Sequence, residues 1–292
     1  MNDTRLDTPG EHRRGIARGV TNAILSATSP RGVLLTGSVA RGDSDDLSDI
    51  DMIAYYDELP DEDALRQVWR DLGRPDRLSS PGRTTTSAST FFRIDGIECQ
   101  VAHLLASSVE RDLDSVLDEL SVDPMLHKKI IGIVGGVPLF GDALIREWQR
   151  RLANFPAPLA RTMIEHYLNR IVPIWTYRDA LARRDAAIWT QEVLVSSAYG
   201  ILGTVAGLNR HYFSSFQFKR AGRFIEAQPV APKNLAARLD GLFSADIDQS
   251  IGDLERLTVE LLMLVQRTMP EAIVPDQLRR TVERTVHSAG EV

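Results

Sequence analysis

Two aspartates spaced two positions apart are the residues of this chain best suited to carry chemistry. Asp49 and Asp51 belong to the segment Ser48-Asp49-Ile50-Asp51-Met52, which leads into a run of apolar and aromatic residues. Alternate side chains of a strand point to the same face, so both carboxylates share one face while Ile50 and Met52 turn into the core. Magnesium prefers such hard oxygen ligands and completes its octahedron with water and substrate phosphates. The spacing therefore predicts a magnesium site that takes a phosphorylated substrate.

A glycine-serine pair upstream of the aspartates predicts a place for the phosphates. Gly37-Ser38 ends a short apolar run and precedes Val39-Ala40-Arg41, which we expect to form a short helical turn. Backbone N–H groups at the start of such a turn lack partners, and glycine lets a phosphate approach them closely. The segment therefore predicts an anion pocket beside the aspartates.

A second metal ion needs a third carboxylate, which should come from a neighbouring strand. Asp95-Gly96 lies between two apolar segments, a strong signal for a two-residue hairpin turn. This turn places Glu98 and Gln100 on one face of the second strand. Glu98 is the anionic member of the two, so it is our candidate for the third ligand and for helping to orient an attacking hydroxyl. Gln100 stays open as the alternative residue at this third position. If Gln100 occupies it, the second metal site lacks its third carboxylate and is damaged.

The elements that must position these residues follow from the hydrophobic pattern. It predicts helices over 11–29 and 61–72, strands over 32–36, 50–56, 90–94 and 97–101, and a loop over 79–87. Strand signals fade from about residue 107, and amphipathic stretches follow over 109–120, 124–134, 141–153, 158–183, 187–207, 232–243 and 247–268. The predicted class is α+β, with a small mixed β-sheet domain over 1–154 and an all-α helical bundle domain over 155–292. The proline-rich segment 154–158 is the predicted boundary.

Composition narrows the classes of function. No apolar run approaches the ~20 residues that a bilayer crossing requires, and residues 1–15 lack the apolar centre of a signal peptide. We therefore expect a cytoplasmic protein with no membrane partner. The single cysteine, Cys99, excludes an internal disulfide and is expected to be a small buried apolar residue.

The charge distribution favours small cationic ligands over polynucleotides. The formal net charge is -6, and residues 43–63 contain many aspartates and glutamates but no lysine or arginine. Such a field repels nucleic acid and attracts metal ions or a cationic small molecule. A solvated loop and helix start explain the part from Asp57 to Asp63 equally well.

Three motifs together resemble the signature of a known superfamily. Gly37-Ser38, Ala40-Arg41-Gly42 and Ser48-Asp49-Ile50-Asp51 occur in the order found in the DNA polymerase beta-like nucleotidyltransferases. The resemblance covers roughly residues 31–104. With its helical second half, the chain is similar to stand-alone bacterial enzymes that nucleotidylate antibiotics such as aminoglycosides and lincosamides.

The resemblance implies a reaction and a role for each residue. The reaction is transfer of a nucleoside monophosphate, expected to be AMP from ATP, to a hydroxyl of a small molecule, with two Mg²⁺ ions and release of pyrophosphate. Gly37 and Ser38 match the positions that hold the triphosphate, and Asp49 and Asp51 match the metal-binding pair. Glu98 is a weaker match to the third acidic position. Arg41, in the matching Ala40-Arg41-Gly42, has two equally favoured roles: contact with the charged triphosphate, or a structural ion pair with a nearby aspartate.

The second half adds one candidate. The segment 208–220 is rich in aromatic and basic residues and resembles one from which a lysine of the second domain reaches the phosphates, which makes Lys219 a candidate phosphate ligand. The alternative for Lys219 is an exposed helix end. Tyr212 and Phe213 could stack on a base or substrate, although packing between helices is the favoured role. His103 could face either the core or the cleft.

Two other functions stay open at this point. One is nucleotidylation of a protein side chain, as in antitoxin-like members of the superfamily. The other is a nucleotide-binding module that performs no chemistry, which a missing third carboxylate would favour.

Overall fold

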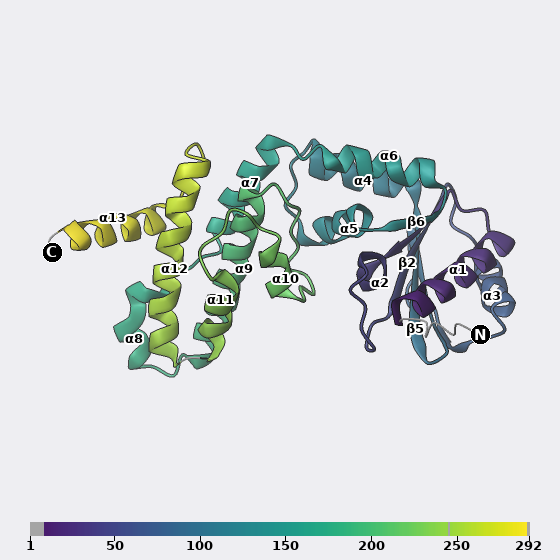
Figure 1. Ribbon diagram of the computed structural model, residues 1–292, viewed down its shortest axis with the longest axis horizontal. Helices are drawn as coiled ribbons and strands as arrows, with labels where there is room; N and C mark the ends of the chain where they lie inside the picture. The colour runs from purple at the N-terminus through teal and green to yellow at the C-terminus, as the bar shows by residue number, and fades with distance from the viewer. Residues whose placement is uncertain (1–8, 245, 291–292) are drawn as a thin grey trace, which may run out of the picture. The chain divides into compact units, whose positions relative to one another are not determined.

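The chain forms two compact units. The structure is a computed structural model and describes residues 9–244 and 246–290. One unit comprises Met1–Asp118 and Lys129–Asn154, and the other comprises Glu119–Lys128 and Phe155–Val292. The first contains the β-sheet and the second is helical (Figure 1). The predicted α+β class, a mixed sheet followed by a helical region, is confirmed.

The sheet of the first unit is mixed and has six strands in the order β3-β4-β5-β2-β1-β6. β2 and β5 pair in parallel, and the other neighbours pair antiparallel. The strands are β1 (Gly32–Thr36), β2 (Ile50–Tyr56), β3 (Asp76–Ser79), β4 (Ser87–Ile94), β5 (Ile97–Leu105) and β6 (Val137–Phe140). The site strand β2 is therefore central, between β1 and β5.

Two edge strands correct the sequence analysis. β3 was not predicted because all of its residues are exposed, so it has no apolar alternation. β6 overturns the expectation that strands end near residue 107. It is short and contains Pro138, which suits an edge position but removes a usual strand signal.

Helices cover both faces of the sheet in the first unit. Val20 and Ile24 of α1 pack in one core with Met52 of β2 and Val68 of α3. On the other face, the ring of Tyr55 meets the α6 indole of Trp148 edge-on at 4.9 Å. The helices with residues in this unit are α1 (Pro9–Ala27), α2 (Gly37–Arg41), α3 (Glu62–Asp71), α4 (Ala106–Leu117), α5 (Pro124–Val134), shared with the second unit, and α6 (Asp142–Ala153).

The predicted hairpin turn is confirmed. Asp95 and Gly96 have φ values of 52° and 78°, and they join β4 to β5. Two successive positive φ angles match the right-handed twist of the flanking strands. The pairing of Arg93 with Glu98 next to this turn fixes which β5 side chains share a face.

The second unit is all helical in its described residues. Its elements are α7 (Ala157–Leu168), the short 3₁₀ helix η1 (Ile174–Tyr177), α8 (Arg178–Ala182), α9 (Ala187–Leu208), α10 (Ala221–Glu226), α11 (Leu235–Ser244), α12 (Ile247–Thr268) and α13 (Asp276–Gly290). The predicted helix over 158–183 is interrupted after Leu168, because Pro173 cannot continue a helix. α10 and α13 were not predicted. In the described part of the chain, no helix combines the length and apolar character needed to cross a membrane.

Candidate active site

Asp49 and Asp51 lie at the start of the central strand. Asp49 directly precedes β2, and Asp51 is its second residue. The alternating Ile50 and Met52 are buried in the core beneath α1, whereas both aspartates are only partly buried. The two carboxylates therefore leave β2 on the face opposite to α1.

The turn after β1 lies directly against Asp51. Gly37 begins α2 with a φ of +70°, and Thr36 before it pairs across the sheet with Asp51. A Cβ at Gly37 would stand 2.2 Å from Asp51 Oδ2, far inside van der Waals contact. The φ angle favours glycine, and any Cβ here would require the Asp51 carboxylate to move. Ser38 follows, and its carbonyl accepts the N–H of Asp43 at 3.0 Å.

Gln100 links Asp49 to Glu98. Its Nε2 donates to Asp49 Oδ2 at 3.2 Å and to Glu98 Oε1 at 2.9 Å. Glu98 Oε2 also lies 3.7 Å from Arg93 Nη2 on the paired strand. The structure thus brings together Asp49 and both residues considered for the third position, and which of the two serves there stays open.

The residues present fit a magnesium ion held by two carboxylates. Asp49 and Asp51 supply hard oxygen ligands on one face, and the close approach of Gly37 leaves the turn backbone beside them. Among residues 9–244 and 246–290, no three or more His, Cys, Asp or Glu side chains gather into a metal-binding group. Glu98 instead contacts Gln100 and Arg93. Its role as a ligand of a second metal ion stays a prediction.

Arg41 forms the ion pair that was one of its two predicted roles. Its Nε lies 3.5 Å from Asp43 Oδ1, and the Asp43 side chain is 6% exposed while that of Arg41 is 45% exposed. The pair braces the turn that follows α2. A contact between Arg41 and a triphosphate stays a prediction.

Lys219 belongs to the second unit, in the segment between α9 and α10. It is exposed and directly precedes Arg220, the N-cap of α10, as the alternative of an exposed helix end predicted. The segment is anchored through Phe213, which is buried against Phe218, and through Ser214, whose hydroxyl donates to the Pro124 carbonyl at 2.6 Å. Phe213 therefore has the packing role. The contact of Lys219 with phosphates stays a prediction.

Cys99 and His103 face the core and not the carboxylates. Burial raises the pKa of the Cys99 thiol to about 12, so it is a poor nucleophile. Burial also lowers the pKa of His103 to about 4. Its two ring nitrogens contact Tyr56 Oη and Thr90 Oγ1, each at 3.1 Å. Both residues are structural.

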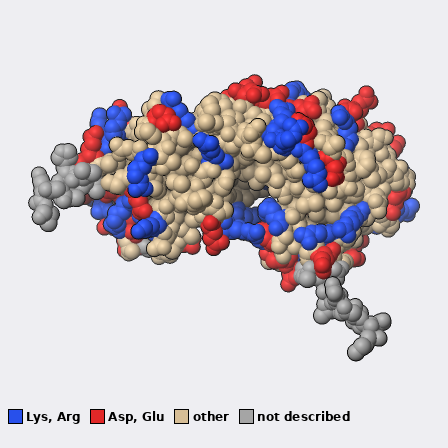
Figure 2. Space-filling view, turned by 45° about the horizontal axis from the view of Figure 1, so that its top comes forward, with Lys and Arg blue, Asp and Glu red and all other residues tan. Residues whose placement is uncertain are grey.

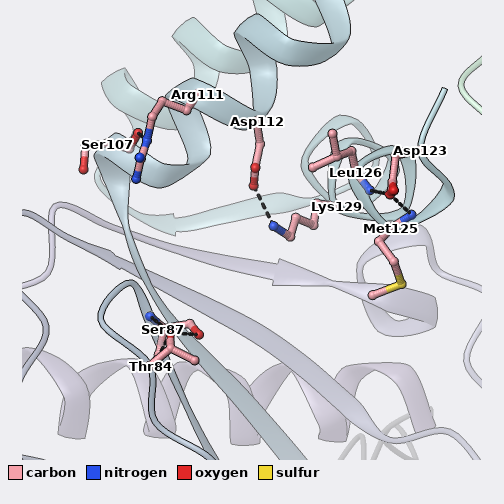
Figure 3. A network of polar contacts seen from close by, with 9 residues as sticks. All are labelled: Thr84, Ser87, Ser107, Arg111, Asp112, Asp123, Met125, Leu126 and Lys129. Atoms are coloured by element: carbon pink, nitrogen blue, oxygen red, sulfur yellow. Dashed lines mark hydrogen bonds and ion pairs between the residues drawn. The ribbon is translucent and has the colours of Figure 1, made fainter. Parts of the chain in front are cut away.

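A second set of polar contacts lies on α4, α5 and the start of β4. Lys129 Nζ of α5 contacts Asp112 Oδ2 of α4 at 2.7 Å, and Arg111 Nε donates to the Ser107 carbonyl (Figure 3). Ser87, which contacts Thr84, pairs with Leu104 at the opposite end of β5 from Glu98. The Lys129–Asp112 contact joins α5 to α4, whereas the Arg111–Ser107 bond lies within α4.

The sequence analysis missed one residue that contacts the site loop. Arg13 of α1 is 5% exposed, and its side chain reaches the backbone of the loop before Asp49. A signal for it exists in the sequence. Arg13 occupies the same helical stripe as Ala17, Val20 and Ile24, where a charged residue needs a specific partner.

Comparisons with known proteins give distant likenesses only. No family model matches the sequence, and no curated protein matches it. A nucleotidyltransferase-like protein from Exiguobacterium sibiricum 255-15 is similar in structure, with 10% identity, 89% of this chain and 80% of that chain covered, and a TM-score of 0.40.

Two further solved structures are similar over part of the chain. A cytoplasmic RNA terminal U-transferase has 14% identity, coverage of 57% and 49%, and a TM-score of 0.28. The Cid1 poly(U) polymerase, as a mutant bound to MgATP, has 14% identity, coverage of 56% and 52%, and a TM-score of 0.27. The chain thus spans about half the length of these two. Function must be argued from the site itself.

Proposed function

We propose that this protein transfers a nucleoside monophosphate from a magnesium-bound NTP, with ATP the expected donor, to a hydroxyl of a small molecule. The observation that carries the proposal is the glycine turn closed against a metal-binding carboxylate. At Gly37, a left-handed backbone that favours glycine lies beside Asp51, with Asp49 on the same face. A divalent cation bound to phosphates is a ligand that matches both groups. The cation is attracted by the carboxylates, and the phosphates are attracted by the backbone N–H groups of the turn.

The chemistry requires that a hydroxyl oxygen form a bond to the α-phosphorus as the bond to pyrophosphate breaks, and that the hydroxyl proton pass to water. When bound, magnesium supplies the charge that neutralises the triphosphate and the departing pyrophosphate. Asp49 and Asp51 hold the cation, while Gly37 and Ser38 position the triphosphate. The Gln100 amide contacts the carboxylates of both Asp49 and Glu98. Glu98 orients the attacking hydroxyl and helps to bind a second cation.

A small cationic acceptor suits this surface better than a polynucleotide does. The segment 43–63, which includes both aspartates, has no basic residue. On the face shown in Figure 2, Lys and Arg groups are interspersed with Asp and Glu groups. An aminoglycoside-like antibiotic, rich in hydroxyls and ammonium groups, is our proposed acceptor class. The need for ATP and magnesium favours the cytoplasm as the place of action.

One observation favours the second candidate, a nucleotide-binding module without chemistry. Glu98 contacts Gln100 and Arg93 and does not join the two aspartates in a three-carboxylate group. A protein with one cation site would bind NTP but transfer nothing.

Incubation with labelled NTPs, magnesium and panels of aminoglycosides, lincosamides and cell extract tests the proposal. We expect the wild type to label an acceptor and to release pyrophosphate, and Asp49→Asn and Asp51→Asn to abolish both while remaining folded. Nucleotide binding without any labelled acceptor would support the binding module. Labelling of a polypeptide in the extract would favour protein modification, and equal labelling by wild type and both variants would end the proposed role of the aspartates.

A further inference from the structure

A buried arginine of the first helix contacts the loop that leads into Asp49. Arg13 Nε donates to the Ser48 carbonyl at 2.9 Å, and its Nη2 donates to the Asp46 carbonyl at 3.1 Å. These bonds join residues 33 and 35 positions apart in the chain. Because Arg13 is 5% exposed, its guanidinium is held at this loop and not in solvent.

The loop that Arg13 contacts is a compact turn. The Asp45 Oδ1 atom accepts the Leu47 N–H at 3.1 Å and the Ser48 hydroxyl at 2.8 Å. The Ser48 N–H in turn donates to the Asp45 carbonyl at 3.1 Å. These bonds close the turn on itself but do not use the carbonyls of Asp46 and Ser48, which are the two that Arg13 takes.

α1 also contacts the other side of the loop. Arg14 Nη2 donates to the carbonyl of Val39, in the middle of α2, at 3.3 Å. In the first turn of α1, a Cβ on Gly10 would lie 3.3 Å from Ser44 Oγ. The helix thus holds the segment between the glycine turn and Asp49 at both of its ends.

We propose that Arg13 is a positioning residue for Asp49, an inference that rests on the proposed function. The Ser48 carbonyl and the Asp49 nitrogen belong to one planar peptide group, so a bond that fixes this carbonyl also fixes the plane from which the Asp49 side chain departs. The Gln100 amide then holds the carboxylate itself. Asp49 is oriented from both sides before a cation arrives.

The geometry requires a guanidinium. Its planar fork reaches two carbonyls at once from a single side chain, whereas a lysine ammonium is a compact charge without that fork. Groups that orient a metal ligand contribute substantially to metal affinity. Arg13→Met keeps much of the apolar stem but removes both donors, and Arg13→Lys keeps the charge. Arg18, exposed on the same helix, provides the control Arg18→Ala.

The test has two readouts, amide hydrogen exchange over residues 43–51 and titration with Mn²⁺ and a non-hydrolysable ATP analogue. We expect Arg13→Met to speed exchange in this segment while the β4–β5 hairpin stays protected, and to weaken Mn²⁺ binding roughly 10-fold to 100-fold. Arg13→Lys should recover only part of the affinity. Arg18→Ala should match the wild type in both measurements.

The outcomes separate this inference from the proposed function. Exchange and Mn²⁺ affinity of Arg13→Met equal to those of the wild type would overturn the role of Arg13. Loss of protection throughout the first unit in both Arg13 variants would also overturn it, because the residue would then serve the whole fold. If the wild type itself binds no Mn²⁺-nucleotide, the proposed function is wrong, and the exchange data alone decide whether Arg13 orders the loop.

Discussion

Gly37 meets two separate demands of the site, a left-handed backbone and a close approach to Asp51. Replacement by alanine violates both, because φ is +70° and the new Cβ would stand 2.2 Å from Asp51 Oδ2. Gly73 offers a matched control, since its φ is +78° but nothing lies within 4 Å of a Cβ there. Comparing the two substitutions separates backbone strain from the collision with the carboxylate.

We expect Gly73→Ala to cost ~1–2 kcal/mol of unfolding free energy from backbone strain alone and to leave nucleotide binding unchanged. Gly37→Ala should cost more than this and should weaken binding of Mn²⁺ with a non-hydrolysable ATP analogue roughly tenfold or more, because Asp51 must move. Denaturant unfolding and titration calorimetry measure the two effects. Similar losses of affinity in both variants would show that the contact with Asp51 is irrelevant.

Gln100 and Glu98 share a contact but should have different kinetic roles. Glu98→Gln removes a charge next to the proposed attacking hydroxyl, so turnover should fall roughly 10-fold to 100-fold while NTP affinity changes little. Gln100→Ala leaves that charge in place and removes only the amide that joins Glu98 to Asp49, so its effect on turnover should be smaller. Steady-state kinetics with varied NTP separates the two. A larger turnover loss in Gln100→Ala would assign the decisive role to the amide.

At the scale of elements, His103 joins three strands through the core. It belongs to β5 and contacts Tyr56 of β2 and Thr90 of β4. Burial holds it neutral, with its pKa lowered from 6.5 to about 4. The unfolded chain therefore binds a proton at a higher pH than the folded chain does, and this favours unfolding in acid.

The sign of this linkage gives a pH-dependent prediction. The contribution of His103 is fully present above pH 6.5 and is lost as the pH falls from 6.5 to about 4, a total of about 3 kcal/mol. His103→Gln cannot take up the proton, so its unfolding free energy should fall less between pH 7.5 and 4.5 than that of the wild type. Urea denaturation at several pH values measures the difference. Parallel pH profiles would show that His103 does not titrate differently on folding.

At the scale of the whole molecule, one prediction concerns a lysine of the second unit. Lys219 and Lys233 are both exposed lysines of this unit, and Lys219 lies in the segment anchored by Phe213. If Lys219 reaches the triphosphate, its ammonium adds charge-assisted hydrogen bonds to the phosphates.

Lys219→Ala should weaken binding of a non-hydrolysable NTP with magnesium about tenfold or more, because such bonds contribute ~1.5–3 kcal/mol. AMP binding should hardly change, since AMP lacks the β- and γ-phosphates. Lys219→Arg should restore the affinity only partly, and Lys233→Ala serves as the control. Equal dissociation constants for wild type and Lys219→Ala would remove this lysine from the site.

The local pattern of the sequence was sufficient for the elements that carry the site. The predicted bounds of β1 and β2, 32–36 and 50–56, agree with those observed, and the Asp95-Gly96 turn is present. These features depend on neighbouring residues, namely strand alternation and the φ angles that a two-residue turn requires. The α+β class followed from the same signals, whereas the domain boundary at 154–158 stays a prediction.

Only the tertiary structure decided which side chains meet. Arg41 pairs with Asp43, Gln100 bridges Asp49 and Glu98, and Arg13 holds the loop before Asp49 from 35 positions away. The edge strands β3 and β6 likewise depend on neighbours in the sheet, because their own residues lack a buried alternating face. The contacts of Gln100 with Asp49 and of Arg13 with the loop depend on the packing of distant segments, which the spacing of residues along the chain does not encode.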